Sequence, residues 1–176
     1  LALALAPVAA VYLIAYPYTK RFTWTANLLL GGALAIAPAA AWIGVRGSLS
    51  WEPVLLSAAV TFWAGSFDIL YHVQDREFYV ARGLHSVAQR FGVVAAFRWS
   101  RALDAMAVGC LVALGVLVGL AYPYFVGCAV AAIILGWKYA IVSPHDLSRM
   151  NVAFLRVNAY VSTAVFGATL IAVLLY

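Results

Sequence analysis

The stretch Ala105-Met-Ala-Val-Gly-Cys-Leu-Val-Ala-Leu-Gly-Val-Leu-Val-Gly-Leu120 decides the fold class of this protein. It contains no charged side chain and is apolar on every face of a helix, so a helix formed here has no side suited to water. About 20 such residues cross the hydrocarbon core of a bilayer. We therefore predict a membrane-spanning helix over residues 105–122.

Five further windows have the same apolar character. They cover residues 1–19, 22–45, 53–71, 124–142 and 157–176. None of them alternates apolar and polar residues as a barrel strand does. The chain is 66% hydrophobic and 10% charged, whereas soluble domains average about 45–50% and 25%. We expect an all-α, polytopic transmembrane helical bundle that forms a single domain over residues 1–176, and this composition excludes a disordered chain.

The basic residues gather on one side of the predicted bundle. Ten of the eleven Lys and Arg residues lie in or beside the connections on that side, and Arg46 alone lies on the other. The positive-inside rule places the basic side in the cytoplasm and both ends of this chain on the opposite face. Topology thus accounts for the net charge of +5, and no nucleic-acid partner is expected.

Two charged residues of the later helices are expected to have ordinary roles. Lys138 lies near the end of an apolar window, and we expect its long side chain to reach the membrane surface. Asp104 follows Arg98 and Arg101 at spacings of three, which favours a local ion pair on one helix.

The segment Asp68-Ile-Leu-Tyr-His-Val-Gln-Asp75-Arg-Glu77 contains three of the six carboxylates of the chain. Asp68 and Asp75 are seven residues apart, so a continuing helix would present both on one face with His72 between them. Mg²⁺ usually binds through one or two carboxylates together with substrate phosphates. The spacing alone fits such a site and fits simple pairing of these acids with nearby arginines equally well.

A second polar segment, Tyr16-Pro-Tyr-Thr-Lys-Arg21, is expected on the same face of the membrane. Tyr16 and Lys20 are four residues apart, so both can face one ligand if this turn is helical. Taken alone, the pair is more simply an interfacial anchor formed by an aromatic ring and a snorkelling cation.

Together the two segments resemble the UbiA superfamily of intramembrane prenyltransferases. Residues 68–92 resemble the second aspartate-rich motif of that family, and Tyr-Pro-x-Thr-Lys-Arg at 16–21 resembles the Tyr-x-x-x-Lys element that precedes it. The resemblance is greatest to the 4-hydroxybenzoate polyprenyltransferase-like enzymes of quinone biosynthesis. One departure is Tyr79, which stands where this subgroup often has another aspartate.

The resemblance implies a magnesium site and a diphosphate site. It makes Asp68 and Asp75 the catalytic residues that hold Mg²⁺ against a prenyl diphosphate. It also implies a set of substrate-binding residues, namely Tyr16, Lys20, Arg82 and Glu77.

The function implied is Mg²⁺-dependent transfer of a polyprenyl group from polyprenyl diphosphate to an aromatic acid such as 4-hydroxybenzoate. Ubiquinone or menaquinone biosynthesis is the implied pathway. The enzyme would lie among the lipids of a bacterial inner membrane, with its active site facing the cytoplasm. The first family motif, Asn-x-x-x-Asp-x-x-x-Asp, is not found. We therefore expect an N-terminally truncated chain with about six of the nine family helices, inactive by itself. A non-catalytic membrane subunit and a small-molecule transporter remain the alternatives.

Overall fold

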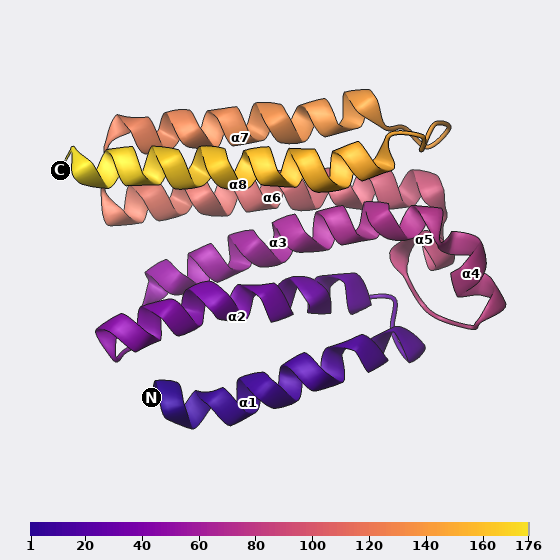
Figure 1. The fold of residues 1–176 in the computed structure, drawn as a ribbon, viewed down its shortest axis with the longest axis horizontal. Coiled ribbons are helices and arrows are strands. Elements are labelled where there is room, and N and C mark those ends of the chain that lie inside the picture. The colour runs from indigo at the N-terminus through magenta and orange to yellow at the C-terminus, as the bar shows by residue number, and fades with distance from the viewer. Residues whose placement is uncertain (176) are drawn as a thin grey trace.

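A computed structural model describes residues 1–175, and every regular element within this range is helical (Figure 1). Six helices are long and apolar enough to cross a membrane, which confirms the predicted fold class. They are α1 (Ala2–Ala15), which continues into the 3-10 helix η1 (Tyr16–Arg21), α2 (Ala26–Arg46), α3 (Trp51–Gln74), α6 (Val93–Val118), α7 (Tyr122–Ile141) and α8 (Met150–Leu174). Two short helices, α4 (Arg76–Ala81) and α5 (Val87–Phe91), connect α3 to α6.

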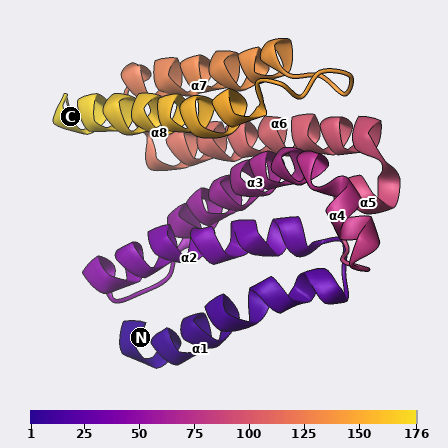
Figure 2. The same ribbon diagram turned by 45° about the vertical axis from the view of Figure 1, so that its right-hand side comes forward.

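Both chain ends lie at one end of the bundle, and η1, α4 and α5 lie at the other, which we call the polar end (Figures 1 and 2). This arrangement agrees with the predicted sidedness of the termini. Helix α3 is central and packs mainly against α2 and α6, while α7 packs mainly against α8. Gly31 permits the close approach of α2 to α3, because a Cβ atom at this position would lie 2.2 Å from the Thr61 carbonyl oxygen.

The carboxyl-terminal half of α3 is held by the largest apolar cluster of the bundle. In this cluster Ile69, Leu70 and Val73 of α3 pack with Val87 of α5 and Phe97 of α6. The cluster therefore fixes the part of α3 that carries Asp68, next to the polar end.

Two helices begin earlier than the charge-free windows predict. The window 105–122 corresponds to α6, which starts at Val93, and the window 157–176 corresponds to α8, which starts at Met150. The charged residues in these extensions are either exposed or paired inside the bundle. Arg98 and Arg156 are exposed, whereas Asp104 is buried and paired with a residue of another helix.

The expected role of Lys138 as a snorkelling cation is wrong. Its side chain is only 1% exposed, and its Nζ lies 2.8 Å from Asp104 Oδ2. Because α7 continues past Lys138 and turns this residue toward α3 and α6, the ammonium group also donates to Ser66 Oγ at 3.1 Å. The local pair between Asp104 and Arg101 is likewise absent from residues 1–175, since Arg101 lies over the Tyr139 ring instead.

Candidate active site

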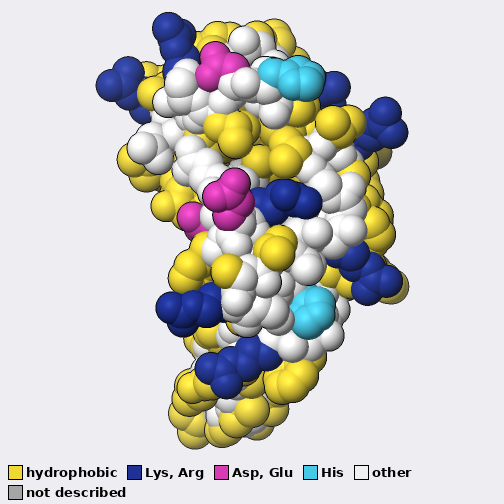
Figure 3. All heavy atoms as spheres, turned by 90° about the vertical axis from the view of Figure 1, so that its right-hand side faces the viewer, with side chains coloured by type: hydrophobic (Ala, Val, Ile, Leu, Met, Phe, Trp, Pro, Cys, Tyr) yellow, Lys and Arg dark blue, Asp and Glu magenta, His cyan; other side chains and the backbone are white. Residues whose placement is uncertain are grey.

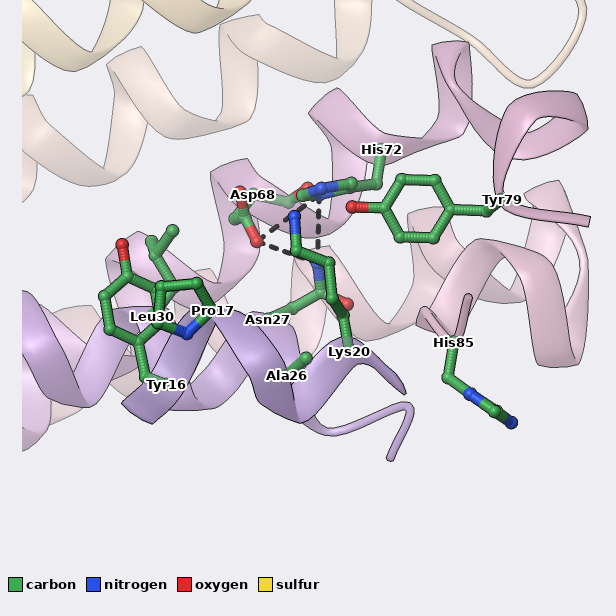
Figure 4. A pocket seen from close by; sticks show the side chains of 10 residues that line it. All are labelled: Tyr16, Pro17, Lys20, Ala26, Asn27, Leu30, Asp68, His72, Tyr79 and His85. Carbon is green, nitrogen blue, oxygen red and sulfur yellow. Dashed lines mark hydrogen bonds and ion pairs between the residues drawn. The ribbon is translucent and has the colours of Figure 1, made fainter. Parts of the chain in front are cut away.

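A small cavity of about 110 Å³ opens at the polar end, between η1, the start of α2 and the carboxyl-terminal half of α3 (Figure 4). Its polar lining comes from segments that are far apart in the sequence. These residues are Tyr16, Lys20, Asn27, Asp68, His72, Tyr79 and His85. The cavity thus unites the two segments that carry the family resemblance.

Local structure explains how Tyr16 and Lys20 reach this cavity. Pro17 stands at the start of η1, where its fixed φ and missing N–H are tolerated. Residues four apart are not aligned in a 3-10 helix, yet Tyr16 and Lys20 both line the cavity. The backbone N–H of His85 donates to the Lys20 carbonyl at 2.7 Å, which ties η1 to the connection between α4 and α5.

Asp68 is the acidic residue of the cavity wall, and its side chain is held in place by two neighbours. Asp68 is only 7% exposed, and its Oδ2 accepts a hydrogen bond from Asn27 Nδ2 at 2.8 Å. His72 Nδ1 lies 3.3 Å from the same oxygen and 2.8 Å from the Asp68 carbonyl oxygen. Asn27 Nδ2 also lies 3.1 Å from His72 Nδ1, so the three side chains form one cluster. A carboxylate fixed in this way is pre-oriented toward the cavity.

Asn27 is a site residue that the sequence analysis missed. It is buried in α2, 41 residues before its partner Asp68, and its Oδ1 accepts from the Val87 N–H at 3.4 Å. The available signal was a single amide inside an otherwise apolar window. Such a residue must find a partner inside the bundle, because lipid offers none.

Asp75, Glu77 and Arg82 lie outside the cavity lining, on the exposed surface of the polar end. Helix α3 ends at Gln74, so Asp75 stands at the junction with α4 and does not continue the Asp68 face of one helix. Figure 3 shows this surface, where acidic side chains are surrounded by Lys and Arg side chains. The roles of these three residues stay predictions.

Tyr79, the departure from the family pattern, is part of the cavity wall. Its side chain is 5% exposed, and Lys20 Nζ lies 5.9 Å from the centre of its ring. Burial, together with the negative charges of Asp68 and Asp75, raises the pKa of Tyr79 to about 12. The phenol is therefore protonated at neutral pH and can act as a hydrogen-bond donor.

The residues present fit a magnesium ion that is shared with a phosphate ligand. Within the described part of the chain, no three His, Cys, Asp or Glu side chains are grouped to hold a metal by themselves. Asp68 supplies one carboxylate to the cavity, and Lys20 supplies a cation beside it. One or two carboxylates plus substrate phosphates are a usual environment for Mg²⁺.

Comparisons with known proteins agree with the resemblance. The profile described as the UbiA prenyltransferase family matches residues 1–175. A 4-hydroxybenzoate octaprenyltransferase of Cupriavidus necator is 33% identical over 96% of this chain and 58% of that protein. One of Methylobacillus flagellatus is 32% identical over 92% of this chain and 54% of that protein. This chain therefore spans little more than half the length of these relatives.

A solved structure supports the same assignment. The apo structure of a UbiA homolog from Aeropyrum pernix K1 superposes with a TM-score of 0.77 at 26% identity. The superposition covers 94% of this chain and 63% of that structure. The family profile, the relatives and the shared fold all agree, and the chain belongs to the UbiA prenyltransferase family.

Proposed function

We propose that the protein transfers a polyprenyl group from polyprenyl diphosphate to an aromatic acid such as 4-hydroxybenzoate, using Mg²⁺. One observation carries this proposal: Lys20 and Asp68, 48 positions apart in the chain, line the same small cavity at one end of a membrane bundle. A cation and a pre-oriented carboxylate suit a magnesium diphosphate. The names of the relatives favour the aromatic acid. The proposal extends to a role in ubiquinone or menaquinone biosynthesis.

The diphosphate end of the donor would occupy the cavity. Lys20 would balance its charge from η1, Tyr16 would contact it from the same turn, and Arg82 would attract it at the exposed rim. Asp68 and Asp75 would hold the Mg²⁺ ion, with Glu77 adding negative charge nearby. When bound, this ion neutralises charge that develops on the departing pyrophosphate.

The reaction then breaks one C–O bond and forms one C–C bond. The electron pair of the bond between the allylic carbon and the diphosphate oxygen leaves with pyrophosphate, and an allylic cation remains. A carbon of the electron-rich aromatic ring attacks this cation and afterwards loses its proton. The long isoprenoid tail is apolar, and the apolar surfaces of the bundle suit it.

The proposed location is a bacterial inner membrane with the polar end in the cytoplasm. The basic connections favour this orientation through the positive-inside rule. A water-soluble aromatic acid and Mg²⁺ would then enter from the cytoplasm, and the donor would arrive through the lipid.

The experiment that tests this function measures prenyl transfer by the full-length protein in lipid nanodiscs. Octaprenyl diphosphate and 4-hydroxybenzoate are supplied with and without Mg²⁺, and the wild type is compared with Asp68→Asn and Lys20→Ala. We expect Asp68→Asn to lower kcat at least about 100-fold, because it removes charge that acts on the reacting group. Lys20→Ala should mainly raise KM for the diphosphate.

The matched control is Asp146→Asn, which changes an exposed acid in the loop between α7 and α8 at the same end of the bundle. This variant should keep wild-type turnover. Near-normal turnover of Asp68→Asn, or transfer that continues without any divalent cation, would contradict the proposed mechanism.

A further inference from the structure

Tyr79 is the buried side chain of a helix that is otherwise exposed. Its neighbours on α4, including Phe78 and Val80, face outward. The Tyr79 ring instead packs edge to face on His72, with 4.9 Å between the ring centres. Tyr79 is thus the residue of this six-residue surface helix that points into the cavity (Figure 4).

The Tyr79 hydroxyl makes no hydrogen bond within residues 1–175, and the residue is 5% exposed and lines the cavity. Figure 4 shows this hydroxyl directed toward the part of the cavity where Lys20 and Asp68 lie. The hydroxyl oxygen itself is accessible from the cavity, so its hydrogen-bonding capacity is open to a partner. The open side of the cavity is where such a partner can come from.

The surroundings of the hydroxyl select the chemistry of this partner. A neutral phenol can donate one hydrogen bond and can also accept, so nearby charge decides which kind of partner is favoured. The Lys20 ammonium group lies against the same ring, at 5.9 Å from its centre, and favours an anion. Two donors of this kind, one charged and one neutral, suit an oxyanion that enters between them.

We propose that the Tyr79 hydroxyl donates a hydrogen bond to a phosphate oxygen of the prenyl diphosphate, beside Lys20. This inference rests on the proposed function and adds a substrate-binding residue to it. Where a carboxylate at this position would bind through a cation, the phenol binds the phosphate directly. Tyr79 thereby contributes to donor binding without adding negative charge to the cavity.

Isothermal titration of the full-length protein in nanodiscs tests this inference, with inorganic pyrophosphate and Mg²⁺ as the probe. Tyr79→Phe removes the hydroxyl and keeps the ring that packs on His72 and Lys20. We expect the Kd for pyrophosphate to rise about tenfold or more, because the lost bond joins a neutral donor to a charged acceptor. The Kd for 4-hydroxybenzoate should not change.

Tyr71→Phe is the matched control. Tyr71 lies on α3, where its ring packs on Phe154 with 4.6 Å between centres, and it is outside the cavity lining. This variant should bind pyrophosphate within about twofold of the wild type, since exposed changes of this size are nearly neutral. Both variants should melt within a few degrees of the wild type, because neither removes a hydrogen bond seen in the fold.

Each outcome has a distinct meaning. If Tyr79→Phe binds pyrophosphate as tightly as the wild type does, the inference is overturned and the proposed function still stands. Weaker binding of 4-hydroxybenzoate alone would overturn it too, by assigning the hydroxyl to the acceptor carboxylate. A wild type that neither binds pyrophosphate nor transfers a prenyl group would overturn both proposals.

Discussion

Replacing Lys138 by methionine should destabilise the bundle strongly. The Lys138 Nζ and Asp104 Oδ2 atoms are 2.8 Å apart, and the two residues are 1% and 5% exposed. Asp104 Oδ1 has no hydrogen-bond partner among the described residues, so this carboxylate relies on Lys138 and on the Tyr139 hydroxyl. Methionine has a similar length but leaves a buried negative charge without its cation.

The geometry sets the scale of the loss. Two unit charges 2.8 Å apart attract each other by about 6 kcal/mol at an effective dielectric constant of about 20. Part of this attraction is recovered in the variant, because Asp104 can take up a proton. Removal of one partner of a buried pair typically costs about 3–5 kcal/mol. We expect Lys138→Met to lower the free energy of unfolding by this amount.

Reversible unfolding in mixed micelles, titrated with SDS and followed by circular dichroism, measures this loss. The double variant Asp104→Asn/Lys138→Met is the informative comparison. It removes both charges and keeps a hydrogen-bond acceptor for Tyr139, so its stability should return to within about 1–2 kcal/mol of the wild type. Arg101→Met, an exposed cation on the same helix as Asp104, should cost less than about 1 kcal/mol.

Two results would refute this reasoning. The first is unfolding of Lys138→Met at the same SDS fraction as the wild type, which would mean that the ammonium group is hydrated in the bundle. The second is a double variant that is as unstable as Lys138→Met alone. In that case the methionine is poorly packed, and the charge of Asp104 is not the cause of the loss.

Three further predictions concern the site and the packing of α2 on α3. Asn27→Leu removes the donor to Asp68 and should reduce prenyl transfer about tenfold with unchanged membrane insertion, whereas Asn27→Gln should recover part of it. Gly31→Ala places a Cβ atom 2.2 Å from the Thr61 carbonyl oxygen, so SDS unfolding should show a loss of about 1–3 kcal/mol. The raised pKa of Tyr79, about 12 against 10.0 normally, predicts stability that is constant below pH 10 and declines between pH 10 and 12. Because the folded state keeps the Tyr79 proton to a higher pH than the unfolded state does, Tyr79→Phe should lessen this decline. Equal pH profiles of the wild type and the variant would contradict this prediction.

The spans of this bundle could be predicted because lipid leaves few options. A segment that crosses the bilayer must be a helix of about 20 apolar residues, and all six windows became such helices. The error lies at the boundaries. A search for charge-free windows stops at Asp104, whereas α6 continues back to Val93, because a charge is tolerated inside a bundle once it has a partner.

The candidate site was predictable in its outline for a different reason. Tyr16, Lys20 and Asp68 belong to short motifs whose order along the chain resembles a known family, so they could be named before any geometry was known. Asn27 belongs to no such motif. Its position in the site follows from the packing of α2 on α3, which no spacing along one helix reveals.

Helix α3 shows why the pairing of buried polar groups depends on the fold. Ser66 and Asp68 are two residues apart, so their side chains point about 200° apart around the helix axis. Asp68 therefore faces α2 and the cavity, while Ser66 faces α6 and α7, where it bonds to Ser100 at 2.7 Å and to Lys138 at 3.1 Å. The chain contains two lysines, Lys20 and Lys138, as possible partners for the two buried acids Asp68 and Asp104. Distance along the sequence does not show which lysine lies near which acid. The two faces of α3 make that choice, since they separate a cavity open to ligands from a closed ion pair that holds the bundle together.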